Sequence, residues 1–160
     1  MNTLFSHVCV VTMDDRMSVW TDAFVGVTDG KISWLSKHAP EEKPDQIIDA
    51  TGMVLMPGLI NCHTHLPMQL LRGYADDLKL QEWLNDYIFP REDRLDGRCV
   101  RAATTLAVAE CLKFGVTSVS DMYYFCDDIC DVIAKSGMKA NISRGTSMFL
   151  GDDFDFEKFP

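Results

Sequence analysis

The architecture of the later part of the chain is predicted from a run of nine residues, Pro57-Gly58-Leu59-Ile60-Asn61-Cys62-His63-Thr64-His65. The apolar run 59–63 is expected to form a buried parallel strand. Side chains at positions i and i+2 of a strand point to the same side, so His63 and His65 can turn both imidazoles toward one point. Neutral imidazole is the commonest protein ligand for zinc. The spacing therefore allows His63 and His65 to bind one divalent metal ion, although a His-x-His pair alone is weak evidence.

The sequence after Met53 alternates between strand and helix signals, which implies a parallel sheet with right-handed crossovers. Two further strands are predicted, at residues 116–119 and 139–143. Three helices are predicted. The first carries the apolar stripe Trp83, Leu84, Tyr87 and Ile88 and ends at Pro90. The second is long, is capped by Asp96 and ends at Gly115, and the third spans 127–136 and ends at Gly137. The histidine pair would then stand at the C-terminal end of the first strand, where (β/α)8 barrels place their active sites.

The first part of the chain, residues 1–55, is expected to be a small β half-sandwich. Short strands are predicted at residues 8–13, 23–27, 31–35 and 47–48. Asp29-Gly30 is a two-residue hairpin signal, and the charged, proline-containing segment 39–45 is expected to be a loop. The second part, 56–160, would hold the first βα units of the barrel, with an acidic loop at 151–160.

Composition excludes several classes of function. The 160 residues carry 15 basic and 24 acidic side chains, a formal charge of −9, with no basic run to bind nucleic acid. No segment reaches the roughly 18 apolar residues of a membrane span, and the start has no basic region typical of a signal peptide. The six cysteines form neither a disulfide framework nor paired C-x-x-C motifs. A reducing cytoplasm is therefore the expected compartment, with Cys126 and Cys130 as reduced thiols rather than metal ligands.

The nine-residue motif resembles the first-strand signature of the amidohydrolase superfamily. Further matches resemble its 5-methylthioadenosine/S-adenosylhomocysteine deaminase and chlorohydrolase branch, and together they cover essentially the whole chain. They are Pro67-Met68, Leu70-Leu71-Arg72-Gly73, Ala75-Asp76-Asp77-Leu78, Glu82-Trp83-Leu84, Pro90, Glu92-Asp93-Arg94-Leu95, Gly115-Val116-Thr117, Asp121-Met122-Tyr123, Gly137-Met138 and Arg144-Gly145.

The resemblance implies roles for five residues. His63 and His65 match metal ligands, and the metal is expected to be zinc, with iron or manganese as alternatives. Glu92 matches a glutamate that holds substrate, typically through a ribose hydroxyl. Arg144 matches an arginine that contacts substrate, and Trp83 matches an aromatic residue near the pocket. The alternatives are a surface charge for Glu92, a salt bridge at the barrel rim for Arg144 and a core position for Trp83.

Three other polar residues have simpler interpretations. Asp121 ends a predicted strand, where a helix cap or a supporting role behind the site is favoured over contact with substrate. His7 and His38 lie in the β segment and are interpreted as structural or exposed.

The resemblance also implies residues that this sequence does not supply. The family uses two more histidines after His65, a late aspartate and a proton-shuttling glutamate. A full (β/α)8 barrel takes about 250 residues, whereas about 100 follow Met53. We therefore expect an α/β fold truncated after about three barrel strands: a shortened or cleaved form, or one piece of a split gene. Such a chain would carry no complete catalytic set and would be inactive alone. It would form homo-oligomers or associate with the remainder of the enzyme.

For the intact enzyme, the resemblance implies a metal-dependent hydrolase of carbon–nitrogen bonds other than peptide bonds. The expected reaction is hydrolytic deamination of a purine nucleoside such as 5-methylthioadenosine or S-adenosylhomocysteine. Another small heterocycle, such as guanine, cytosine or a triazine, is the alternative substrate, handled by a deaminase or chlorohydrolase. A catalytically inactive fragment that acts only as an interaction module is the third hypothesis.

Overall fold

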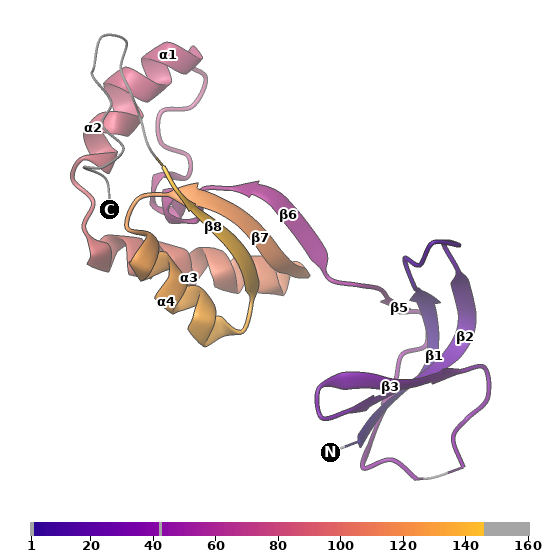
Figure 1. Cartoon of the computed structure of the whole chain (residues 1–160). Helices are drawn as coiled ribbons and strands as arrows, with labels where there is room; N and C mark the ends of the chain where they lie inside the picture. Colours follow the sequence, from indigo (N-terminus) through magenta and orange to yellow (C-terminus); the bar gives the residue numbers. More distant parts are fainter. Residues whose placement is uncertain (1, 42, 146–160) are drawn as a thin grey trace. The chain divides into compact units, whose positions relative to one another are not determined.

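The structure, a computed structural model, describes residues 2–41 and 43–145 (Figure 1). The chain divides after Pro57 into two compact units, each with its own buried core. The division lies two residues beyond the boundary expected from the sequence. The loop expected at 151–160 lies outside the described residues.

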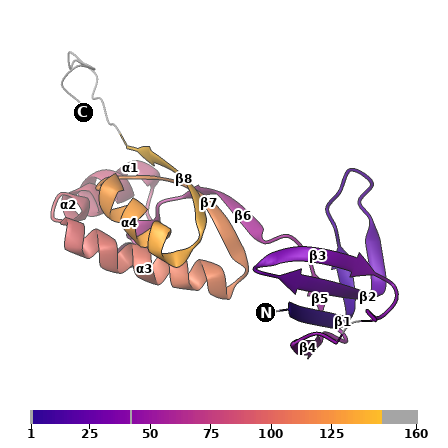
Figure 2. The ribbon, with the colours of Figure 1, turned by 60° about the horizontal axis from the view of Figure 1, so that its bottom comes forward.

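The first unit, here the β unit, is one five-stranded sheet (Figure 2). Its strands are β1 (Asn2–Val11), β2 (Val19–Thr28), β3 (Lys31–Ser36), β4 (Gln46–Asp49) and β5 (Val54–Leu55). The order is β3-β2-β1-β4, and β5 pairs with β1 beyond the end of β4. The first three strands are antiparallel, whereas β4 and β5 run parallel to β1.

The β unit confirms the predicted hairpin and lengthens the predicted strands. Asp29 and Gly30 both have positive φ angles, 49° and 73°, as a two-residue hairpin turn requires. β1 begins at Asn2 rather than at residue 8, because pairing with β2 and β4 keeps its first half extended although Ser6 and His7 interrupt its apolar pattern. The buried core consists of Val8, Val10, Ala23, Val25 and Ala50.

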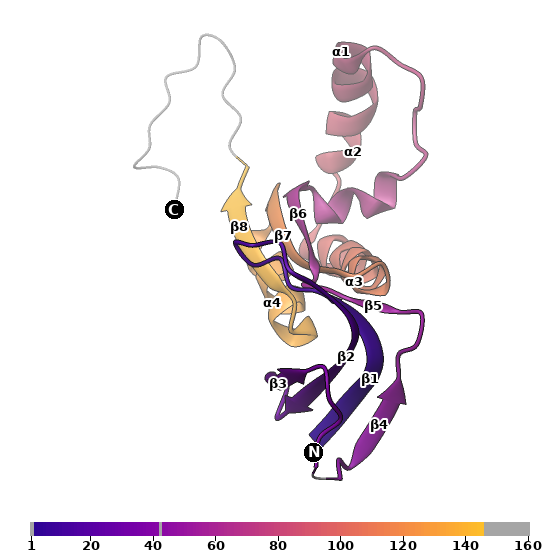
Figure 3. The same cartoon turned by 90° about the vertical axis from the view of Figure 1, so that its right-hand side faces the viewer.

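The second unit, here the α/β unit, is built on a parallel sheet in the order β6-β7-β8. Its strands are β6 (Leu59–Thr64), β7 (Val116–Tyr123) and β8 (Lys139–Arg144), and its two long helices are α3 (Gly97–Lys113) and α4 (Cys126–Ser136). Both helices pack on one face of the sheet, around Val100, Val119 and Ile129. The three strands point to the same end of the sheet (Figure 3). The predicted strand–helix alternation is thus confirmed for the described part.

The ends of the two long helices follow the sequence signals. Asp96 Oδ1 accepts a hydrogen bond from Cys99 N at 2.7 Å, which caps the start of α3. Gly115 and Gly137 follow α3 and α4 with φ angles of 79° and 75°, a left-handed conformation that glycine adopts without strain.

The prediction that β6 is buried is wrong. Leu59 and Ile60 are 49% and 67% exposed. β6 is an edge strand of the sheet, and the helices that cover one face pack chiefly on β7 and β8. In the described residues no second layer covers the opposite face.

The prediction that Pro90 ends its helix is also wrong. A helical run continues through α1 (Leu80–Glu82), the π-helical turn η2 (Trp83–Ile88) and α2 (Phe89–Glu92). Proline lacks an N–H and clashes with the carbonyl four residues earlier in an α-helix. In the π-helical turn η2, Phe89 N donates to Leu84 O, five residues earlier, and this turn widens the helix immediately before Pro90.

β7 is four residues longer than predicted. It continues past Val119 to Tyr123 because β8 pairs with it as far as Arg144. This extension brings Asp121 beside Thr64, at the end of β6 where the histidines lie. Among residues 2–41 and 43–145, no helix is both long and apolar enough to cross a membrane.

Candidate metal site and substrate pocket

His63 and His65 bring their Nε2 atoms together at the C-terminal end of β6. The two atoms are 3.2 Å apart, and the rings are nearly perpendicular, with an interplanar angle of 84°. Two imidazole nitrogens bound to one tetrahedral zinc ion at about 2.05 Å would be about 3.3 Å apart. The observed pair therefore has the separation that two zinc ligands need.

The ring of His65 is held in one tautomer. Its Nδ1 lies 2.7 Å from the backbone oxygen of Met122 in β7. A carbonyl oxygen only accepts, so Nδ1 carries the hydrogen and the neutral ring keeps a lone pair on Nε2. A hydrogen bond from the second ring nitrogen is typical of metal-bound histidine. This arrangement fits a metal ligand and selects Nε2 as the ligating atom.

In the described part of the chain, His63 and His65 are not joined by a third potential ligand. No group of three or more His, Cys, Asp or Glu side chains is placed so that it could hold a metal ion. Two histidines alone leave at least two positions of a tetrahedral site for other donors.

A cavity of about 260 Å³ opens beside His65. It is lined by His65, Met68, Trp83, Leu84, Ile88, Phe89, Glu92, Met122, Tyr123, Tyr124 and Gly145. Two of the three predicted substrate-binding residues, Trp83 and Glu92, are therefore in the same cavity as one predicted metal ligand. An apolar, aromatic lining with few polar groups is typical of a small-molecule pocket.

Glu92 is held by Tyr123, a residue of the Asp121-Met122-Tyr123 match for which the sequence predicted no role of its own. The hydroxyl of Tyr123 donates to Glu92 Oε1 at 2.6 Å. Burial, and then the neighbouring Glu92 carboxylate, raise the pKa of Tyr123, so its hydroxyl stays protonated and remains a donor. A carboxylate can accept several hydrogen bonds, so Tyr123 uses only part of the accepting capacity of Glu92.

Arg144, the third predicted substrate-binding residue, is placed differently. It pairs with Tyr123 across β7 and β8, is exposed, and is not among the residues that line the cavity, although the next residue, Gly145, is. Its charge lies near Cys126 and lowers the pKa of that thiol, although burial has the larger effect and raises it. The role of Arg144 toward substrate stays a prediction.

Asp121 lies beneath the histidine pair and is 1% exposed. Its Oδ1 accepts from the N–H of Leu66, the first residue of the 3-10 helix η1 (Leu66–Leu71), at 2.6 Å. This is the capping role expected of it. Burial raises the pKa of Asp121, against the lowering effect of its hydrogen bonds to Leu66 and Thr64.

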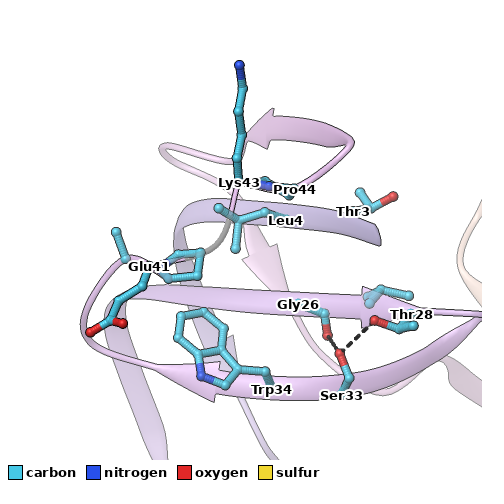
Figure 4. Close-up of a pocket in the computed structure, with 12 residues that line it drawn as sticks. Thr3, Leu4, Gly26, Thr28, Ser33, Trp34, Glu41, Lys43 and Pro44 are labelled. Carbon is cyan, nitrogen blue, oxygen red and sulfur yellow. Dashed lines mark hydrogen bonds between the residues drawn. The ribbon is translucent and has the colours of Figure 1, made fainter. Parts of the chain in front are cut away.

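The β unit contains a larger cavity, of about 440 Å³, between β1, β2, β3 and the following loop (Figure 4). Its polar groups are partly engaged with one another, since Ser33 Oγ donates to the Gly26 carbonyl at 3.2 Å and lies 3.1 Å from Thr28 Oγ1. Its described lining contains no histidine or cysteine. This cavity therefore carries none of the chemistry predicted for His63 and His65.

The remaining histidines and cysteines agree with their simpler interpretations. His7 is 52% exposed and its Nδ1 lies 2.8 Å from Asp22 Oδ1, and His38 is exposed. All six cysteines are free thiols.

Comparisons with known proteins show the family to which the chain is related. The model of the amidohydrolase family matches residues 54–142. The 5'-deoxyadenosine deaminase of Methanosarcina acetivorans is 41% identical over 142 residues, which are 89% of this chain and 33% of that protein. The 5-methylthioadenosine/S-adenosylhomocysteine deaminase of Pelotomaculum thermopropionicum is 39% identical over 147 residues, 90% of this chain and 34% of that protein.

A solved structure shows the same likeness in three dimensions. An adenosine deaminase from Xanthomonas campestris with bound zinc is similar with a TM-score of 0.78 and 36% identity, over 86% of this chain and 32% of that one. The chain thus spans about a third of the length of the curated relatives that it matches.

Proposed function

The chain belongs to the amidohydrolase family, and from this premise we propose that it forms the metal- and substrate-binding start of a hydrolase that deaminates a purine nucleoside. The observation that carries the proposal is the convergence of His63 Nε2 and His65 Nε2 at 3.2 Å, directly beside a cavity of about 260 Å³. The zinc-bound deaminase among the similar structures supports zinc as the metal.

The metal would be held by His63 and His65 through Nε2. Its contribution when bound is to acidify water to a pKa of about 7, so that a nucleophile for hydrolysis exists at neutral pH. The chain's own contribution is to fix the ligands. The Met122 carbonyl orients His65, and His63 Nε2 lies 3.2 Å from His65 Nε2.

The substrate would be held by the cavity lining. Trp83 offers an aromatic face on which a flat heterocycle can stack, and Glu92 can accept a hydrogen bond from a ribose hydroxyl. Tyr123 fixes the Glu92 carboxylate for this task. Arg144 is proposed as a further contact at the end of β8. The nucleoside is favoured over a bare guanine, cytosine or triazine ring because relatives near 40% identity are named as deaminases of adenosine derivatives.

Zinc titration of the purified chain tests the metal site. We expect zinc binding that weakens at least tenfold in His63→Ala and in His65→Ala, because each variant loses one of two protein ligands. His38→Ala is the matched control, since His38 is exposed in the β unit. Equal zinc binding in all four proteins would contradict the assignment of the ligands.

Tryptophan fluorescence tests the pocket. Titration with 5-methylthioadenosine should quench emission in the wild type and in Trp34→Phe, but not in Trp83→Phe, because Trp83 lines the cavity. Glu92→Gln should weaken binding of the nucleoside more than binding of adenine, which has no ribose. Quenching by guanine or a triazine alone would favour the other substrates. Absence of both zinc and nucleoside binding, with stable self-association, would favour an interaction module.

A further inference from the structure

The end of β6 that carries the histidines is not held by a regular strand ladder. β6 and β7 pair in register through Ile60 and Asn61, but the register shifts between Asn61 and Thr64. An irregularity of this kind leaves extra backbone unpaired and bends the strand. His63 lies within the shift and His65 follows it, so other contacts must fix the two rings.

A single buried carboxylate supplies contacts on both sides of His65. Asp121 Oδ1 lies 2.7 Å from the hydroxyl of Thr64, the residue before His65, and accepts from the N–H of Leu66, the residue after it, at 2.6 Å. Both partners donate, because a carboxylate oxygen can only accept. The backbone of His65 is thus held between two hydrogen bonds to one atom.

The ring of His65 is held by Met122, the residue that follows Asp121 in β7. The Met122 carbonyl accepts from His65 Nδ1 at 2.7 Å. Two consecutive residues of β7 therefore control the backbone and the ring of His65. The His63 ring meets His65 only through the 3.2 Å approach of the Nε2 atoms.

We propose that Asp121 is a positioning residue that aligns His65 for metal binding by holding Thr64 and Leu66 on either side of it. The proposal rests on the function proposed above, in which His63 and His65 bind the metal. It goes further because Asp121, which is not proposed as a metal ligand, would determine the direction in which His65 Nε2 points.

The second oxygen of Asp121 argues against a role in packing alone. Asp121 Oδ2 and Thr104 Oγ1 are the buried side-chain atoms that lack a hydrogen-bond partner among the described residues. A buried polar atom without a partner is destabilising, so an apolar residue would suit this position better if it only filled space. The contribution of Asp121 is instead its Oδ1 atom, which accepts hydrogen bonds from Thr64 and Leu66.

Two variants that keep the branching of the side chain at Cγ separate these roles. Asp121→Asn has nearly the same size and can keep an acceptor oxygen at the Oδ1 position, whereas Asp121→Leu removes both acceptor oxygens and adds volume. Thr64→Val removes the hydroxyl, and with it the contacts to Asp121 and to the Ser120 carbonyl, but leaves the bond from Leu66 N to Asp121, so it provides a milder test if Asp121→Leu fails to fold. Thr104→Val is the matched control, because it also replaces a buried hydroxyl of the α/β unit, in α3, by a methyl group.

The first readout is the tautomer of His65 in the metal-free chain, from the nitrogen chemical shifts of its ring. We expect the Nδ1–H tautomer in the wild type, Asp121→Asn and Thr104→Val, and a mixture of tautomers in Asp121→Leu and Thr64→Val. The second readout is zinc affinity, which should fall by about tenfold or more in Asp121→Leu, as when the hydrogen-bond partners that orient metal ligands are lost. It should fall less in Thr64→Val and stay within about threefold of wild type in Asp121→Asn.

The two readouts distinguish failure of the proposed metal site from failure of the positioning role of Asp121. A wild-type chain that binds no zinc would contradict the proposed metal site, while the tautomer would still report on Asp121. Folded Asp121→Leu or Thr64→Val with the wild-type tautomer and zinc affinity would overturn the positioning role.

Discussion

The β unit and the α/β unit solve the same problem, a small sheet that must bury one face, in different ways. In the β unit, β1 is paired along both edges by β2, β4 and β5, and the core lies largely within one layer of strands. In the α/β unit the strands are parallel, and α3 and α4 cover one face of the sheet. All three strands of the α/β unit end at the same edge of its sheet, so this unit gathers three neighbouring strand ends, and their polar residues, in one place.

The difference is visible in the polar pairs of the two units. In the β unit, His7 meets Asp22 at a strand irregularity, where both residues have positive φ, and the contact lies in solvent. In the α/β unit, Asp121 holds the segment around His65 from a buried position. Both contacts lie near cavities: His7 and Asp22 line one of about 410 Å³ in the β unit, whereas Asp121 holds the segment of His65, which lines the cavity of about 260 Å³.

Core truncations give the largest expected effect and test whether the two cores are independent. Ile129 is 0% exposed, and Ile129→Ala should lower the free energy of unfolding of the α/β unit by about 3 kcal/mol through lost apolar burial and a cavity. Val25 is 2% exposed, and Val25→Ala should destabilise the β unit by about 2 kcal/mol. Hydrogen exchange followed for each strand measures both effects.

The pattern of protection decides the outcome. Ile129→Ala should speed exchange in β7 and β8 while leaving β1 and β2 unchanged, and Val25→Ala should do the reverse. If either variant loosened both sheets equally, the two units would share one cooperative core and the comparison would fail.

Much of this fold could be predicted because local signals are strong in both units. The Asp29-Gly30 turn, the Asp96 cap and the two stop glycines act through a few neighbouring residues, and all are confirmed. The errors arise where distant partners decide. The exposure of β6 and the length of β7 depend on which strands pair and which face the helices cover, and no local pattern records this.

The site shows the same limit. The strand period sufficed to predict that His63 and His65 converge, although a register shift lies between Asn61 and Thr64. Tyr123 and the Met122 carbonyl were missed because β7 was expected to stop at residue 119. The apolar pair Met122-Tyr123, which follows Ser120-Asp121, was a signal that could have extended it.

Close backbone packing gives the second prediction, which contrasts one glycine from each unit. A Cβ at Gly58 would lie 2.1 Å from Thr117 Oγ1 and 2.7 Å from Thr117 Cβ, so Gly58→Ala should cost about 1 to 2 kcal/mol through overpacking. A Cβ at Gly26 in the β unit would lie 3.4 Å from Trp34 Cβ, and Gly26→Ala should change stability by less than about 1 kcal/mol. Denaturant unfolding measures both.

The double variant Gly58→Ala/Thr117→Ala tests the cause. Alanine at 117 removes the two nearest atoms but keeps Cβ, so part of the lost stability should return. A purely additive result, or a Gly26→Ala variant as unstable as Gly58→Ala, would show that steric packing against Thr117 is not the reason.

The smallest expected effects are pH-dependent and come from one exposed aspartate in each unit. The Cys99 N–H holds the pKa of Asp96 below its usual value at the start of α3, and hydrogen bonds from Thr51 do the same for Asp49 in the β unit. A carboxylate with a lowered folded pKa stabilises the protein above its unfolded pKa of about 3.9, and this contribution is lost as the pH falls through the folded pKa.

Asp96→Ala should therefore lower the Tm of the α/β unit by a few degrees at pH 7, and this loss should shrink as the pH falls below the unfolded pKa of about 3.9 and through the lowered folded pKa. Asp49→Ala should show the same dependence in the β unit, with a smaller effect because the aspartate closes a turn and does not also meet the positive end of a helix dipole. Thermal unfolding at several pH values, followed by probes in each unit, gives both curves. A loss for Asp96→Ala that is independent of pH would mean that the hydrogen bond from Cys99 N, and not the charge of the carboxylate, stabilises the start of α3.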